Sequence, residues 1–191
     1  MFEFQNLPHI SEKLPLLRTR HDWEIEATKN AYYLFRQVHL SGVLHAAWSR
    51  LLRRAYTLSD LSQALAARRL LGSHYLGSQA VEIQKIVGSE GRCSDFDRDF
   101  RPLCRHAVHR WARIAALMLL NEPLPAVELI QVGETYYVRD GHHRISVARA
   151  LGNRAIDASI TAWCLAESTS EMPLEVRAEQ FEELTINTRH F

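Results

Sequence analysis

The spacing of apolar residues predicts a helical first part of the chain. Apolar positions recur every three or four residues over 22–42, 43–56 and 61–71, and each run is expected to form an amphipathic helix. Ser41 and Gly42 are expected to end the first helix, and Gly72 the third. Residues 1–20 contain two prolines and show no clear period, so an irregular arm is expected there.

The second part of the chain alternates between strand and helix patterns. Strands are predicted over 81–87, 126–132, 135–139 and 156–162, and Gly133 and Glu134 suit a tight hairpin turn between the middle two. A long helix is predicted over 103–120, with Val108, Trp111, Ala115 and Met118 on its buried side. Residues 95–100 are predicted to form a surface turn held by Phe96 and Phe100.

These elements predict an α/β (α+β) fold with a small mixed sheet and an N-terminal helical extension. The extension is assigned to residues 1–75, the sheet domain to 76–165, and an acidic tail to 166–191, with one more helix expected over 174–184. The helical extension is expected to pack through Trp23, Leu34 and Trp48. Because its helices carry much apolar surface, a homo-oligomer is a further expectation.

The most informative stretch runs from Tyr136 to Gly152. Strand formers at 136–138 lead into Asp140 and Gly141, and apolar residues at helical spacing follow from Ile145. A helix that begins after a tight turn presents free backbone N–H groups and a partial positive charge, which favour an anion. Gly141 would let the backbone approach a ligand closely, and Arg144 could hold two phosphate oxygens.

A simpler interpretation of the same turn needs no ligand. In it, Asp140 caps the helix, and His142, His143 and Arg144 form a solvated first turn.

Composition narrows the classes of function. The formal net charge of +1 over 191 residues gives no overall attraction to nucleic acid or anionic membranes. The most apolar run, 114–120, is too short to cross a bilayer, and residues 1–20 do not have the pattern of a signal peptide. The three cysteines form no C-x-x-C pair, which favours a reducing cytoplasm over a disulfide framework.

The segment from Val81 to Ala162 resembles the ParB/sulfiredoxin superfamily. The resemblance rests on the order of strand, long helix and Pro125-led hairpin, followed by the run DGHHRISVARALG at 140–152. It implies that the turn from Gly141 to Arg144 binds nucleotide phosphate. His142 occupies the place of the reactive cysteine of sulfiredoxins, which makes that activity unexpected. The short acidic tail argues against a chromosome-partitioning clamp.

The turn is most similar to that of the free-serine kinases of this superfamily. That resemblance implies Glu90 as general base, acting on a small hydroxyl substrate. It further implies Asp140 in a Mg²⁺ or phosphate shell, and a nucleotide (ATP, ADP or CTP) held with Mg²⁺. The phosphate contacts are assigned to Gly141, His142, His143 and Arg144, with Arg92 as an additional clamp.

Two other functions compete with phosphotransfer. A nucleotide-switched regulatory or DNA-associated module is the main alternative, with Arg50, Arg53 and Arg54 as its basic cluster and a helix-turn-helix as its weak structural signal. A zinc site is the other. His142 and His143 suggest it, and His106 and His109, three residues apart on a predicted helix, are further candidate ligands, although no H-E-x-x-H or Cys/His set completes the site.

Overall fold

The computed structural model describes residues 19–66 and 68–167. Within them, one six-stranded mixed sheet has the order β1-β3-β5-β4-β6-β2. The strands are β1 (Ser59–Asp60), β2 (Arg68–Glu82), β3 (Ile86–Ser89), β4 (Val127–Val132), β5 (Thr135–Asp140) and β6 (Ala155–Glu167). β5 pairs parallel to β3 and antiparallel to β4, while β6 runs parallel to β4 and antiparallel to β2. The expected α/β class and the hairpin around Gly133 are therefore confirmed.

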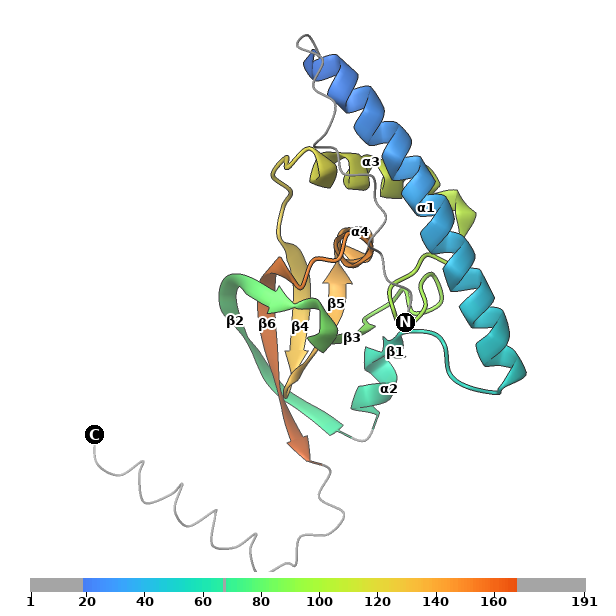
Figure 1. The fold of residues 1–191 in the computed structure, drawn as a ribbon. Coiled ribbons are helices and arrows are strands. Elements are labelled where there is room, and N and C mark those ends of the chain that lie inside the picture. Colours follow the sequence, from blue (N-terminus) through green and yellow to red (C-terminus); the bar gives the residue numbers. More distant parts are fainter. Residues whose placement is uncertain (1–18, 67, 168–191) are drawn as a thin grey trace, which may run out of the picture.

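Three of the helices form layers on one side of this sheet. α4 (His142–Ala150) contacts β4 and β6, α3 (Val108–Leu119) contacts α4, and α1 (Arg20–Leu51) contacts α3 (Figure 1). The short α2 (Leu61–Leu65) follows β1, and two 3-10 turns occupy Ile83–Lys85 and Arg105–Ala107. In the part of the chain described here, no helix is long and apolar enough to cross a membrane.

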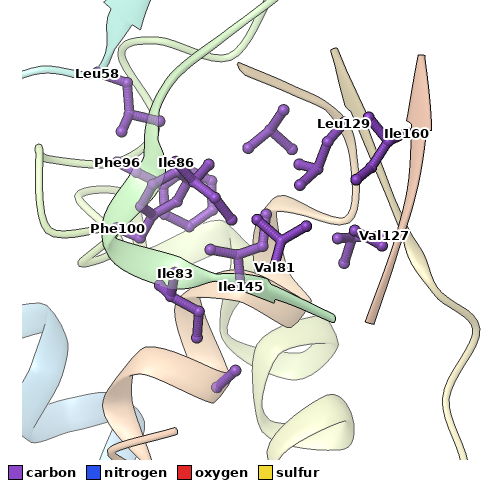
Figure 2. Packing of buried hydrophobic residues seen from close by; sticks show 13 residues of the cluster. Leu58, Val81, Ile83, Ile86, Phe96, Phe100, Val127, Leu129, Ile145 and Ile160 are labelled. Atoms are coloured by element: carbon purple, nitrogen blue, oxygen red, sulfur yellow. The ribbon is translucent and has the colours of Figure 1, made fainter. Parts of the chain in front are cut away.

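The main core lies between the sheet and α4. Ile86, Leu129 and Ile160 from the strands meet Ile145 from α4 and the two rings of the 95–100 turn (Figure 2). Phe96 and Phe100 are both buried, so the predicted anchoring of this turn is confirmed. A second core joins α1 to α3 and α4 through Leu34, Phe35, Trp111, Ala115 and Val147.

The two helices predicted over 22–42 and 43–56 are one helix of 32 residues, so that prediction was wrong. Gly42 does not end the helix but is buried within it. A Cβ there would lie 2.9 Å from Arg101 Cβ, so the glycine lets the 100–102 segment pass close to α1. Beside it, His39 Nδ1 lies 2.9 Å from the carbonyl oxygen of Pro102.

The prediction of a helix over 61–71 was also wrong, because the helix ends at Leu65. Residues 68–82 form β2, which pairs with β6 along its length and runs through the expected domain boundary at residue 75. The second helix of the helix-turn-helix interpretation is therefore reduced to the five residues of α2. The strand predicted over 81–87 is divided by a 3-10 turn, and only its last part belongs to β3. Of the three residues predicted to pack the helical part, only Leu34 belongs to the second core, because Trp23 and Trp48 are exposed by 39% and 63%. The helix expected over 174–184 lies outside the described residues.

Candidate functional site

The turn from β5 to α4 depends on a glycine. Gly141 has φ +98°, a region that side chains with a Cβ rarely adopt, and a Cβ there would lie 2.6 Å from Val127 Cγ1. α4 begins directly after it, with Ile145 N–H donating to the Gly141 carbonyl. No side chain caps this helix, so the interpretation of Asp140 as a helix cap was wrong. The free N–H groups of the first turn are left for another partner.

Arg144 fixes the turn from the other side. Its Nη1 donates to the carbonyls of Pro125 and Ala126, the latter at 2.7 Å, and its Nη2 pairs with Asp140 Oδ2 at 2.7 Å. The guanidinium therefore ties the start of α4 to the segment that leads into β4. Its primary structural task is to hold the turn, which leaves only part of its donor set for a ligand.

His142 is buried and bonded to the end of β3. Its Nε2 lies 2.7 Å from Ser89 Oγ, which also accepts the backbone N–H groups of Gly91 and Arg92 at 3.1 Å. The N–H groups of Gly91 and Arg92 occupy the two lone pairs of that hydroxyl, so its own proton is assigned to the bond with His142 Nε2, which accepts. His142 is then neutral, and Ser89 links the 90–92 loop to the first turn of α4.

His143 is also buried, so the solvated first turn expected in the simpler interpretation was wrong. Burial first, and then the neighbouring charges of Arg110 and Arg92, lower the pKa of His143 to about 4. The pKa of His142 is likewise lowered to about 4, first by burial and then by Arg92. Both imidazoles are neutral at pH 7 inside a positively charged environment.

The structure brings all the sequence-predicted site residues around one cavity of about 330 Å³. Glu90 and Arg92 come from the loop after β3, and Asp140 to Arg144 come from the β5–α4 turn. Glu90 lies beside the end of β5, where its N–H donates to the Val138 carbonyl at 3.0 Å and its Oε2 pairs with Arg139 Nε at 3.0 Å. Elements more than forty residues apart in sequence therefore line the same small space.

Four residues of the cavity were missed by sequence reasoning: Gly91, Arg110, Ile114 and Arg139. Arg139 is the last residue but one of β5, and Arg110 and Ile114 belong to α3. In the sequence, Arg110 is simply one of several arginines on an amphipathic helix. Only the packing of α3 on α4 turns it toward the cavity.

The cavity is positively charged. Four arginines line it, against the two carboxylates of Glu90 and Asp140, each of which is already paired with an arginine. Among residues 19–66 and 68–167, the guanidinium groups of Arg92 and Arg110 have no ion pair. With the unpaired helix N–H groups, these two side chains make a site suited to an anion with several oxygens.

The expected metal sites have less support from the protein alone. Within the described ranges, no group of three or more His, Cys, Asp or Glu side chains could hold a metal ion. His109 does not join His106 but lies 2.8 Å from the Tyr32 hydroxyl. Asp140 and Glu90 are the acids at the cavity, and Mg²⁺ there would need phosphate oxygens to complete its shell.

A second cavity of about 520 Å³ lies at the end of α1, lined by His45, Trp48 and Arg98 among others. The buried carboxylate beside it, Asp97, is bonded within the 97–101 turn. Its Oδ1 accepts the N–H groups of Asp99 and Arg101, and its Oδ2 pairs with Arg101 Nε at 3.0 Å. This cavity is larger than the first one and also has two arginines on its wall, Arg54 and Arg98, but it lies at the carboxyl end of α1 and lacks the helix N–H groups of the first.

Comparisons of the chain with family models, curated proteins and solved structures give no match. The chemistry of the site therefore has to be argued from its own geometry.

Proposed function

We propose that this protein binds the phosphate groups of a nucleotide in the 330 Å³ cavity at the start of α4. The observation that carries the proposal is the uncapped N-terminus of α4, which opens into a cavity lined by four arginines. Backbone N–H groups and guanidinium groups are the donors that phosphate oxygens require. The cavity is large enough for a short phosphate chain, with the nucleoside extending toward the open side.

Each side of the cavity has a separate task in this proposal. Arg92 and Arg110 contact the phosphates from the loop and from α3, since both are free of other ion pairs among the described residues. Gly141 and the N–H groups of His142 and His143 approach from the start of α4. Arg144 keeps this turn in place through Pro125 and Ala126.

The same site supports phosphotransfer to a small hydroxyl compound. In that reaction the hydroxyl oxygen bonds to the terminal phosphorus, its proton passes to Glu90, and the bond from that phosphorus to the rest of the nucleotide breaks. Glu90 lines the cavity, and its pairing with Arg139 fixes the direction of the carboxylate. Mg²⁺, held by Asp140 and by phosphate oxygens, would neutralise phosphate charge.

The binding step is tested by calorimetric titration of the full chain with ATP, ADP and CTP in the presence of Mg²⁺. Arg110→Ala is expected to weaken binding by at least tenfold, because it removes a free cation from the cavity. Arg113→Ala is the matched control on the same helix, since Arg113 is exposed and does not line the cavity. Arg144→Ala is a poorer test, because it would also loosen the turn. Absence of binding by all three nucleotides would refute the proposal.

The catalytic step is tested with Glu90→Gln. Turnover of the nucleotide with a panel of small hydroxyl compounds is expected to be lost, while nucleotide affinity is retained. Glu134→Gln, in the exposed hairpin turn, is the control for loss of one carboxylate. If Glu90→Gln turns over like the unchanged protein, the base assignment fails. If the unchanged protein binds a nucleotide but transfers no phosphoryl group to any hydroxyl compound, the nucleotide-switched alternative is favoured instead.

A further inference from the structure

α1 has apolar residues on two opposite sides. Ala27, Ala31, Leu34 and Val38 form the buried side, which packs on α3. On the other side, five large apolar side chains are exposed by between 52 and 73% and fall within an arc of about 80° at 100° per residue: Tyr33, Leu40, Leu44, Trp48 and Leu51. Figure 1 shows α1 along the edge of the molecule, with α3 on its inner side.

The exposed side has a regular seam. Its residues at 33, 37, 40, 44, 47 and 51 are spaced by alternating steps of four and three, the heptad repeat of paired helices. Four of the six are large and apolar, one is Ala47, and the only polar one is Gln37. All six are exposed in the isolated chain. The buried side already supplies the internal packing of α1, so the heptad seam has no partner among the described elements.

We propose that this seam is the interface with a second copy of the chain, formed by two α1 helices that pack antiparallel about a two-fold axis near residue 42. In this register Leu40 packs against the partner's Leu44, and Tyr33 packs against the partner's Leu51. Gln37 then lies opposite the partner's Ala47, where its size and polarity disfavour slipped registers. The seam is self-complementary, as a two-fold interface requires.

The charges of α1 select the antiparallel orientation. The first two turns carry acidic side chains and the end of the helix carries arginines: Asp22, Glu24 and Glu26 against Arg50, Arg53 and Arg54. Antiparallel packing about residue 42 places the basic ends of the two helices at opposite ends of the seam and opposes the two helix dipoles. Parallel packing would instead place both basic ends together.

The test is the oligomeric state of the full chain, measured by sedimentation at several concentrations. A dimer is expected, and Leu44→Glu is expected to weaken it at least tenfold, because it places two charges within the seam. Leu71→Glu on β2 is the matched control, since Leu71 is 67% exposed and Leu44 is 69% exposed. Leu51→Glu, at the end of the seam, provides a second variant, and circular dichroism verifies that each variant is folded.

Three results would overturn the inference. One is a monomer at the highest soluble concentration of the unchanged chain. Another is a dimer that Leu71→Glu dissociates and Leu44→Glu does not, which would place the interface on β2. The third concerns orientation, in a background where Cys93, Cys104 and Cys164 are replaced by serine. Tyr33→Cys mixed with Leu51→Cys should form a disulfide between copies, whereas self-linking of Leu51→Cys alone would require parallel helices.

Discussion

The indole Nε1 of Trp111 donates a hydrogen bond of 2.8 Å to Ser146 Oγ, and both residues are buried where α3 meets α4. This bond fixes the distance between the helix that carries Arg110 and the helix whose start forms the cavity. It therefore couples the packing of the second core to the geometry of the proposed phosphate site.

Ser146→Ala is expected to lower the free energy of unfolding by about 2 kcal/mol, because it leaves a buried indole N–H without a partner. Chemical denaturation measures the loss. The double variant Trp111→Phe with Ser146→Ala should show coupling between the two sites. Strictly additive effects would mean that the bond contributes little.

Ser89→Ala should loosen the 90–92 loop. The hydroxyl bonds His142 Nε2 and accepts two backbone N–H groups, so its removal is expected to cost about 2 kcal/mol of stability. Ser94→Ala, at an exposed position in the same loop, is the control and should have little effect. Equal unfolding midpoints for the two variants in urea would contradict the assignment of Ser89 as the anchor of the loop.

Gly141→Ala should destabilise the protein more than Gly133→Ala. Both glycines have positive φ, but a Cβ at 141 would meet Val127 at 2.6 Å, whereas a Cβ at 133 has no atom within 4 Å. The variant at 133 is expected to show the backbone cost alone, about 1 kcal/mol, and the variant at 141 an additional packing cost of about 1–3 kcal/mol. Thermal unfolding of the two proteins gives the comparison, and a larger loss at 133 would argue against the close contact.

Stability should decrease as the pH falls from about 6.5 toward 4. The pKa of both His142 and His143 is lowered to about 4 in the folded protein, so the unfolded chain takes up protons first as the solution is acidified. Each histidine contributes up to about 3 kcal/mol of this loss. His143→Asn should flatten the dependence measured by urea unfolding at several pH values. The exposed His106→Asn should leave it unchanged, and an equal slope in all three proteins would contradict the assignment.

The candidate turn could be predicted because its information is local. Asp140, Gly141 and the two histidines are consecutive, and a strand pattern before them and a helical pattern after them place them at a helix start. Arg110 and Arg139 could not be found in this way. Arg110 lies in an ordinary amphipathic pattern, and only the contact of α3 with α4 brings it to the cavity. Arg139 directly precedes the turn, but only its ion pair with Glu90 shows that its side chain lies at the cavity.

The errors in the first part of the chain have a similar cause. A glycine after a serine is a common helix end, but Gly42 is used for close packing against Arg101, a contact with a distant segment. Leu65, Leu70 and Leu71 fit a helical period, yet residues 68–82 pair with β6, and strand pairing over that separation leaves no trace in local sequence. Leu70 and Leu71 are adjacent and both exposed, so this part of β2 does not show the alternation of apolar and polar residues that indicates a half-buried strand.

The order of strands in the sheet affects how the protein is made. β6 occupies the place between β4 and β2, so neither the parallel pairing with β4 nor the antiparallel pairing with β2 can form until residues 155–167 have left the ribosome. Until then, β2 has no neighbouring strand, and its large apolar residues Leu70, Leu71 and Tyr75 are exposed to solvent. Synthesis thus creates an interval in which this segment is open to association with other chains.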